Sequence, residues 1–479
     1  MPDTQLAIIG AGPAGLSAAV AAASAGVHVA LIDEDSQIGG QIFRQMPETF
    51  QVTGERFPGR TGKKAQTLFA QVVNSKIEFR PETTVWGIFQ PLALALQTAD
   101  LAETLTPQKL IIATGAYDRP TPFPGWTLPG VMTAGGAQAL IKSQGVLPGR
   151  RVILAGSGPF LLPVAAQLIL GGAEVVAILE ASRPSRWIGK LPALWGQWER
   201  FRETLEYLKI IHSVDVPIHF GQTIVAAHGD DVLREVTIAE LDTEWRSIPD
   251  TKCRIAVDAA CIGFWFISST QLSRLCGCDH LYRPEAGGWV VAHDVSQRTS
   301  NPDVFVAGES TGISGADVAM AQGSIAGIFA AQDLGVISEA EAVRRAQPYQ
   351  QKLQRHQPFV AMLRDLFAPR CGLLDLITDD TTICRCEAVM AGCIRNAIRN
   401  GADDVNAVKA KTRTGMGLCQ GRICERLVAE MIASETDKPV DAVGTFTARP
   451  IIKPVRLAEI AKMGGVERED RNLELYEKG

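Results

Sequence analysis

Residues 6–40 read LAIIGAGPAGLSAAVAAASAGVHVALIDEDSQIGG, and this stretch decides the fold of the chain. The apolar run at 6–9 predicts a buried strand, and the motif GAGPAG follows at once and opens an Ala-rich helix that ends near Ala25. A second strand is predicted at 27–32. A glycine motif alone is weak evidence, but strand, turn, helix and strand in this order predict a βαβ unit that binds a dinucleotide.

Each glycine of the turn has a separate role. Gly10 permits the tight turn, Gly12 lets the backbone approach a pyrophosphate, and Gly15 lets helix and strand pack closely. The phosphates then lie on the helix N-terminus, where free N–H groups and the dipole favour anions. Asp33 follows the second strand and suits the ribose hydroxyls, with Glu34 as the alternative if the register slips by one. We interpret the ligand as FAD; an ordinary βαβ unit with incidental glycines is the alternative.

Length and composition indicate an ordinary multidomain protein. A chain of 479 residues predicts about three domains. A formal net charge of -5 does not indicate the excess of basic residues that is typical of nucleic-acid-binding proteins. The sequence begins without a signal peptide, and no apolar run is long enough to span a membrane. We therefore expect a cytoplasmic protein. Ten cysteines, clustered late in a large chain, favour metal ligation over disulfide bonds.

A second, less regular βαβ pattern follows a proline-rich crossover at 117–149. A strand is predicted at 151–155, a turn at Gly156-Ser157-Gly158, a helix at 159–170 and a strand at 173–179. Leu161 replaces the third glycine, so we expect its side chain to hinder close helix packing and nicotinamide binding to be doubtful. Glu180 would suit ribose hydroxyls, whereas Arg183 and Arg186 weakly favour a 2′-phosphate.

A second contact with the flavin is predicted near Gly308-Glu309. The segment 301–309 reads as a loop that feeds a buried strand, and a helix rich in small residues follows at 316–335. An acid at a strand end can bind ribityl hydroxyls, while the next helix N-terminus, near Gly315, faces the electron-rich edge of a flavin. A simple strand-to-helix turn is the alternative.

The most discriminating pattern is CRC at 384–386, followed after thirty-two residues by CQGRIC at 419–424. Four thiolates in two close pairs indicate a metal site, either a [2Fe-2S] cluster or zinc, although structural zinc sites more often use C-x-x-C spacing. Cys393 is expected to be a core residue rather than a spare ligand. Four basic residues would offset the charge of a cluster, although plain solvation is the simpler interpretation of each: Arg385, Lys411, Arg413 and Arg422.

Other chemistry is not indicated. The chain contains no C-x-x-C, which excludes a dithiol relay of the thioredoxin reductase kind. The histidines are scattered without metal spacing or a base partner, so no catalytic residue is assigned.

Several motifs together resemble a known family. GAGPAG with GGQIFR, KLIIATGAYDRP, the PGV turn, GSGPFLLP, CRCE and TRTGMGLCQGRIC resemble the large flavoprotein subunit of multi-subunit bacterial dye-linked dehydrogenases. This family includes the large subunits of opine oxidase and D-hydroxyproline dehydrogenase, together with the flavoprotein subunit of hydrogen cyanide synthase. Two residues depart from the pattern: Glu309, where related flavoproteins usually have Asp, and Leu161.

The resemblance implies a disulfide-oxidoreductase-like α/β fold with two dinucleotide-binding domains, followed by a small helical domain of the bacterioferritin-associated-ferredoxin type. That domain would hold a [2Fe-2S] cluster through Cys384, Cys386, Cys419 and Cys424. In such complexes an amino-acid-oxidase-like flavoprotein subunit oxidises the substrate, and related sarcosine oxidases and proline dehydrogenases hold an FMN at the subunit interface. Further expectations are a small third subunit, a quinone or cytochrome acceptor, and peripheral attachment to the inner membrane through the complex.

The predicted domains divide the chain as follows. Residues 1–118 and 280–336 should form a discontinuous FAD-binding domain, 119–279 a second nucleotide-binding-like domain, 337–378 a helical linker, 379–447 the [2Fe-2S] domain and 448–479 an extended tail. The expected FAD contacts are Gly10, Gly12, Pro13, Ala14, Gly15, Asp33, Glu34, Gly40, Gln41, Thr114, Gly115, Gly308 and Glu309.

Three functions follow as hypotheses. The first is an FAD and [2Fe-2S] electron-transfer subunit of a heteromeric amino-acid or opine dehydrogenase, with the C–N bond oxidised on a partner subunit. The second is a self-sufficient NAD(P)H-dependent reductase, against which Leu161 counts. The third is a non-enzymatic scaffold whose four cysteines hold zinc.

Overall fold

The computed structural model describes residues 2–47, 50, 60–99 and 101–463. Its first unit is built on a five-stranded parallel sheet in the order β20-β7-β1-β2-β3. The strands are β1 (Thr4–Ile9), β2 (Val29–Ile32), β3 (Ile77–Arg80), β7 (Pro107–Ile112) and β20 (Val304–Val306). Because β20 comes from far along the chain, this unit is discontinuous in sequence.

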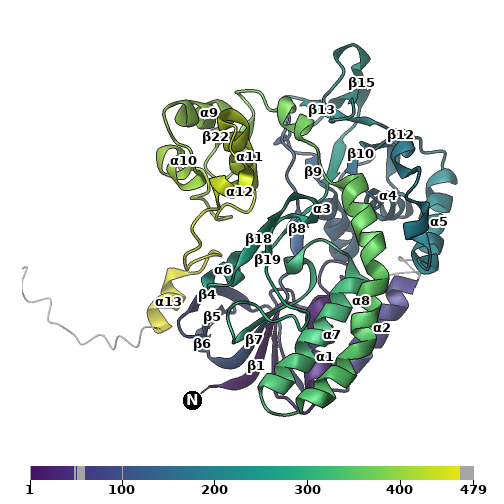
Figure 1. Cartoon of the computed structure of the whole chain (residues 1–479). Helices are drawn as coiled ribbons and strands as arrows, with labels where there is room; N and C mark the ends of the chain where they lie inside the picture. Colours follow the sequence, from purple (N-terminus) through teal and green to yellow (C-terminus); the bar gives the residue numbers. More distant parts are fainter. Residues whose placement is uncertain (1, 48–49, 51–59, 100, 464–479) are drawn as a thin grey trace, which may run out of the picture.

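Helices cover one face of this sheet (Figure 1). They are α1 (Pro13–Ser24), α2 (Arg60–Val73) and α7 (Ala316–Asp333). α1 and α7 approach so closely that a Cβ at Gly323 would lie 2.0 Å from the carbonyl oxygen of Ala14. The small residues of α7 are therefore required by its packing against α1.

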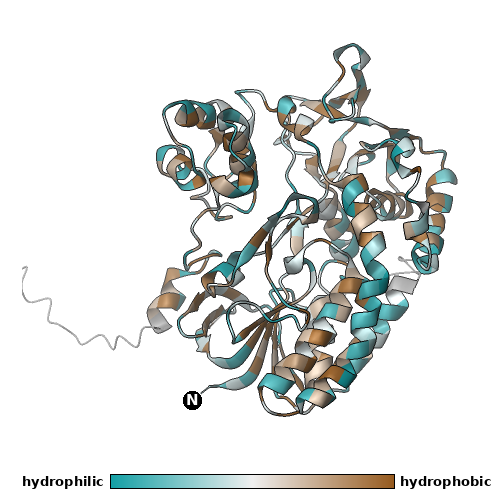
Figure 2. Ribbon diagram, in the orientation of Figure 1, coloured by the Kyte–Doolittle hydropathy of each residue, from teal (hydrophilic) through white to brown (hydrophobic). Residues whose placement is uncertain are grey.

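An antiparallel sheet covers the other face. It consists of β4 (Thr84–Phe89), β5 (Ala93–Gln97) and β6 (Ala102–Leu105). Alternate strand residues point to opposite faces, so Ile8 packs under the helices while Ile9 packs against β4–β6. Because both faces of these central strands are covered, their sequences are continuous apolar runs. Figure 2 shows these strands in brown, the colour of hydrophobic residues.

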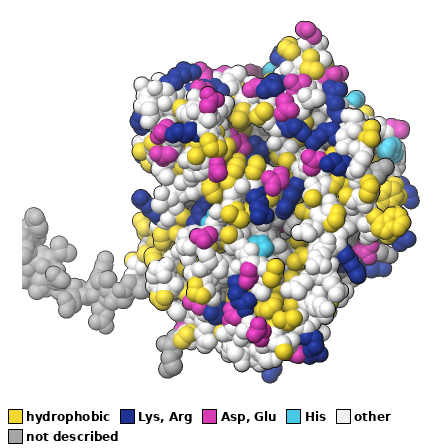
Figure 3. Space-filling model, viewed as in Figure 1, with side chains coloured by type: hydrophobic (Ala, Val, Ile, Leu, Met, Phe, Trp, Pro, Cys, Tyr) yellow, Lys and Arg dark blue, Asp and Glu magenta, His cyan; other side chains and the backbone are white. Residues whose placement is uncertain are grey.

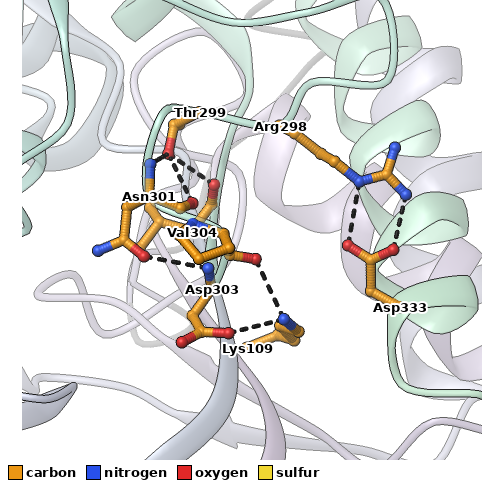
Figure 4. Close-up of polar contacts among 8 residues, drawn as sticks. Lys109, Arg298, Thr299, Asn301, Asp303, Val304 and Asp333 are labelled. Atoms are coloured by element: carbon orange, nitrogen blue, oxygen red, sulfur yellow. Dashed lines mark hydrogen bonds and ion pairs between the residues drawn. The ribbon is translucent and has the colours of Figure 1, made fainter.

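A hydrogen-bonded turn delivers β20 to the edge of the sheet (Figure 4). The Asn301 side-chain oxygen accepts from the Asp303 N–H at 3.0 Å, and Lys109 on β7 donates to the Asp303 carboxylate at 2.7 Å. Arg298 forms a two-bond ion pair with Asp333 at the end of α7. β20 and α7 are thus fixed together, which positions the turn between them.

A second five-stranded parallel sheet has the order β12-β11-β10-β16-β9. Helices pack on one face and a three-stranded antiparallel sheet on the other. The main strands are β9 (Val131–Thr133), β10 (Arg151–Ser157), β11 (Glu174–Glu180), β12 (Ile218–Phe220) and β16 (Ala259–Phe264). The helices are α3 (Ala134–Ala139), α4 (Leu161–Leu170) and α5 (Trp198–His212), and the covering strands are β13 (Gln222–His228), β14 (Glu235–Glu240) and β15 (Cys253–Ala256).

A long helix joins the two units to a small third one. α8 (Glu339–Phe367) runs along α7 and ends beside the second sheet (Figure 1), and its surface is largely hydrophilic teal in Figure 2. The small unit packs short helices around a two-stranded hairpin over its own core. Its elements are β21 (Thr382–Cys384), β22 (Val389–Met390), α9 (Ala391–Arg399), α10 (Val405–Thr412), α11 (Glu425–Thr436) and α12 (Val440–Val443).

The predicted fold class is confirmed, with two dinucleotide-binding-like α/β units and one small helical unit. Among the described residues, no helix has both the length and the apolar character needed to cross a bilayer.

Candidate cofactor sites

The first glycine turn opens into a cavity of ≈ 1480 Å³. This volume exceeds the roughly 300–1,000 Å³ of ordinary small-molecule pockets and suits a dinucleotide. The structure brings to this cavity every predicted FAD contact except Gly15: Gly10, Gly12, Pro13, Ala14, Asp33, Glu34, Gly40, Gln41, Thr114, Gly115, Gly308 and Glu309. We call this space the flavin cavity.

The geometry of the turn explains its three glycines. A Cβ at Gly15 would lie 1.7 Å from the carbonyl oxygen of Gly10, so only glycine permits this contact between helix and turn. Gly15 is therefore a packing residue that does not line the cavity. A Cβ at Gly12 would meet only Gly40, at 3.8 Å, so a side chain there would project into the cavity. The open backbone at Gly12 and the helix start at Pro13 fit a pyrophosphate.

The two acidic residues at the end of β2 lie differently. The Asp33 carboxylate accepts from the backbone N–H of Ala11 in the glycine turn and from that of Asp35 at 2.8 Å. Burial raises the pKa of Asp33 despite these bonds. Glu34 instead forms an ion pair with Lys453. Asp33 is thus the acid held at the turn, in the position where a ribose-binding carboxylate is expected.

Glu309 lies where α7 begins. It is half-buried, accepts a hydrogen bond from the Gly315 N–H at 3.3 Å, and the burial of its carboxyl group raises the pKa. Thr114 lies beside it through a 3.3 Å hydroxyl contact with Ser310. The strand end, the acid and the helix N-terminus therefore meet at one wall of the flavin cavity, as the sequence pattern predicts.

Further polar residues line the flavin cavity without having been predicted as FAD contacts, among them Arg44, Lys142, Arg422 and Lys453. Lys142 donates to the Ile42 carbonyl at 3.1 Å, and burial together with nearby Arg44 lowers the pKa of its amine to about 8. Arg44 lies in the GGQIFR motif, which was a usable signal. The other residues have no local signal, because they reach the cavity from other units.

The four predicted ligand cysteines lie in two pairs on facing segments of the small unit. Cys384 and Cys424 are buried and Cys386 is exposed at the surface. A Cβ at Gly417 would lie 2.2 Å from the Cys386 Cβ, so glycine lets the second cysteine loop close over the first. The two cysteine motifs therefore face each other across this small unit.

The thiols lie in two pairs. Cys384 is hydrogen-bonded to Cys424, and this bond lowers the pKa of the Cys384 thiol to about 5. Cys386 is likewise paired with Cys419. Among the described residues no three His, Cys, Asp or Glu side chains converge as a single-ion site. Two sulfur pairs suit two irons with two thiolates each better than one tetrahedral zinc.

The basic residues near the cysteines mostly have other partners. Lys411 donates to the Asn400 carbonyl, Arg413 pairs with Glu387, and Arg385 lies over the Trp126 ring at 5.5 Å. Arg422 alone of these four contacts a ligand residue, donating to the Cys419 carbonyl at 3.1 Å. Cys393 is exposed on α9, so its expected place in the core is wrong.

A buried charge network fixes the small unit to the rest of the protein. Glu430 on α11 accepts two bonds from Arg119, at 3.0 and 2.8 Å, and one from Arg426 at 2.8 Å. Nearby, Arg274 of the first unit pairs with Glu425 at 3.0 Å, directly after Cys424. The cysteine loop is thus held against the flavin cavity.

Comparison with known proteins identifies both cofactor-binding parts. The sequence profile of the pyridine nucleotide-disulphide oxidoreductase family matches residues 4–323, and that of the BFD-like [2Fe-2S] binding domain matches residues 382–434. Hydrogen cyanide synthase subunit HcnB of Pseudomonas aeruginosa is 33% identical over 461 residues, which cover 95% of this chain and 98% of the relative. The A-subunit of opine oxidase of Rhizobium meliloti is 32% identical, over 95% of this chain and 87% of the relative.

A solved structure supports the fold. The crystal structure of L-proline dehydrogenase from P. horikoshii matches with a TM-score of 0.68 at 21% identity, over 95% of this chain and 79% of that chain. At this identity the match shows a common architecture only.

Proposed function

The chain belongs to the pyridine nucleotide-disulphide oxidoreductase family, in the group that contains HcnB and the opine oxidase A-subunit, and we propose that it is the electron-transfer subunit of a heteromeric amino-acid or opine dehydrogenase. Its cofactors are FAD and a [2Fe-2S] cluster. When bound, FAD accepts an electron pair and the cluster carries electrons singly. In this proposal the C–N bond of the substrate is oxidised on a partner subunit.

One observation carries the proposal: the flavin cavity and the cysteine loop share a wall. Arg422 lies between Cys419 and Cys424 in sequence, donates to the Cys419 carbonyl, and lines the flavin cavity. Its second bond, to the Ile452 carbonyl at 3.0 Å, holds the segment that also lines the cavity. The two cofactor sites are therefore adjacent within one chain, as a relay of electrons requires.

The chain's own residues have defined tasks in this proposal. Gly12 and the start of α1 bind the pyrophosphate, Asp33 binds ribose hydroxyls, and Glu309 with the N-terminus of α7 orients the flavin. The four thiolates hold the cluster. Arg119, Arg426 and Glu430 keep the small unit at a fixed distance from the cavity.

An exposed apolar surface offers a place for the partner to bind. Figure 3 shows hydrophobic side chains gathered at the right, over α5. Trp195 and Trp198 are 81% and 60% exposed there, and Ile188, Phe201 and Leu205 are exposed too. The opposite face of α5, with Arg200, Glu203 and Tyr207, lines the flavin cavity. Large exposed patches mark interaction sites, and this one adjoins the cavity.

We assign the partner as an amino-acid-oxidase-like flavoprotein subunit. The same proposal includes a small third subunit, an FMN at the subunit interface, a quinone or cytochrome acceptor, and a cytoplasmic complex attached peripherally to the inner membrane. The zinc-scaffold alternative loses its support, because residues 382–434 match a [2Fe-2S] binding domain.

Purification of the tagged chain from its native host tests the proposal. A copurifying flavoprotein, together with about one FAD, two irons and two acid-labile sulfides per chain, is expected. A colourless protein that contains zinc and brings no flavoprotein with it would refute it.

A further inference from the structure

The second glycine turn does not have the geometry of the first. In the first turn the positive φ falls on Gly10, at 105°, and α1 begins at Pro13. In the second turn it falls on Gly158, at 106°, and α4 begins only at Leu161, two residues after the corresponding Pro159. The helix N-terminus that would receive a pyrophosphate is therefore displaced.

A side chain of the protein itself lies against this turn. A Cβ at Gly158 would lie 3.5 Å from the Phe367 ring on one side, and Gly158, like Gly12, also lines the flavin cavity. Phe367 is the last residue of α8 and is 3% exposed. Its ring packs edge-to-face on Trp187, with the centroids 5.6 Å apart. Phe367 thus covers the side of the second glycine turn that faces α8.

Polar groups around the turn bind the end of α8. Ser157 Oγ donates to the Phe367 carbonyl at 3.1 Å, and Ser182 Oγ donates to the Leu366 carbonyl at 2.8 Å. Arg186 Nη1 also donates to the Leu366 carbonyl, at 3.1 Å. The last carbonyls of a helix lack partners within the helix, so these bonds satisfy them. The same groups are then unavailable to a nucleotide.

The acid of the second motif is enclosed as well. Glu180 is 9% exposed, and its carboxylate accepts from the Gly158 and Ser182 N–H groups, each at 2.8 Å. Burial raises its pKa to about 7. Unlike Asp33, it does not line the flavin cavity.

The chain then continues along the second unit to the cysteines. A Cβ at Gly372 would lie 2.4 Å from the Glu244 carbonyl oxygen, and Leu373 and Leu376 enter the core of the second unit. Trp126 Nε1 donates to the Thr382 carbonyl at 2.8 Å, two residues before Cys384. The segment from the end of α8 to the first ligand is therefore fixed to the second unit.

We propose that the second dinucleotide-binding motif takes no nucleotide and instead binds residues 365–367 of the same chain. The second unit thereby holds in place the linker that positions the cluster domain. Phe367 then covers one side of the motif, and together with the occupied polar groups it disfavours NAD(P)H as the reductant. This role of Phe367 is independent of which partner subunit the chain binds.

Nucleotide binding by the FAD-loaded chain is the first test. Calorimetric titration with NADH, NADPH and AMP, each to several millimolar, should give no saturable heat, and NADH should leave the flavin oxidised. Saturable binding of any of the three, or bleaching of the flavin by NADH, would overturn the proposal.

The binding of residues 365–367 to the second motif is tested by the double variant Ser157→Ala/Ser182→Ala. This variant removes both hydrogen bonds from the hydroxyl groups and leaves the packing intact. Hydrogen exchange in peptides spanning 362–376 should quicken by roughly tenfold, because two buried hydrogen bonds are lost. The control is Ser324→Ala on α7, where another buried serine donates to a helix carbonyl. The control should leave 362–376 unchanged. Equal exchange in the double variant and the wild type would show that these bonds do not hold residues 365–367 on the second motif.

Discussion

Replacement of Glu430 by Gln tests how the small unit is held. The change is nearly isosteric but leaves Arg119 and Arg426 without a counter-charge in a buried site that contains three hydrogen bonds to the carboxylate. Removal of one partner from a buried ion pair costs about 3–5 kcal/mol. Opening of the small unit should therefore become roughly 10²- to 4 × 10³-fold more frequent.

Hydrogen exchange in α11 and limited proteolysis between 371 and 381 measure this opening. The matched control is Glu435→Gln on the same helix, which removes a half-exposed pair with Arg395 that lies within the small unit. We expect the control to change opening less than about fivefold, because such pairs contribute about 0–1 kcal/mol. Equal effects of the two variants would show that Glu430 does not hold the small unit in place.

The same network predicts a dependence on pH. Burial would raise the pKa of Glu430, but Arg119 and Arg426 outweigh it and hold the pKa below its ordinary value of 4.5. A carboxyl group with a depressed folded pKa stabilises the native state above its unfolded pKa and loses that contribution as the pH falls through the folded value. Attachment of the small unit should thus be constant above about pH 4.5 and weaken below it. Glu430→Gln should remove this acid dependence; if it persists unchanged, another group is responsible.

Three further substitutions separate the sites. Cys419→Ser should abolish the cluster's visible and EPR signals while FAD stays bound, because the two sites use different residues; loss of both in a folded protein would contradict the division. Gly12→Val should abolish FAD binding, since its side chain would enter the pyrophosphate space, and an unchanged flavin content would refute that assignment. Trp198→Glu should reduce copurification of the partner at least tenfold with FAD retained, whereas Val73→Glu, at another exposed apolar position, should not. Equal copurification in both would exclude α5 as the interface.

Local patterns were sufficient to predict the first dinucleotide-binding unit and the cysteine pairs. Strand, turn and helix of the first unit follow one another within residues 4–32, so residues close together in the sequence determine how these elements pack. The cysteine motifs are similarly compact. The assignments of FAD contacts and cluster ligands gain support from the cavity and the sulfur pairs, and their direct roles stay predictions.

Contacts between distant segments had no such signal. The expected hindrance by Leu161 stays a prediction: its side chain is buried, 3.1 Å from the place of a Cβ at Gly263, and α4 begins later in its motif than α1 does in the first. Phe367 covers one side of Gly158, and it lies more than 200 positions later in the chain, at the end of α8. The pairing of Arg119 with Glu430 is equally remote, so its partners had no common motif.

Anaerobic stopped-flow spectroscopy of the flavin and cluster distinguishes a relay driven by a partner subunit from a self-sufficient reductase. The chain alone should stay oxidised when mixed with NADH, glycine, hydroxyproline or an opine. Once the copurified partner is added, one amino acid or opine should bleach the flavin and then reduce the cluster, and Cys419→Ser should stop the second phase only. Rapid bleaching of the isolated chain by NADH, or by an amino acid without the partner, would contradict the proposed electron-transfer role.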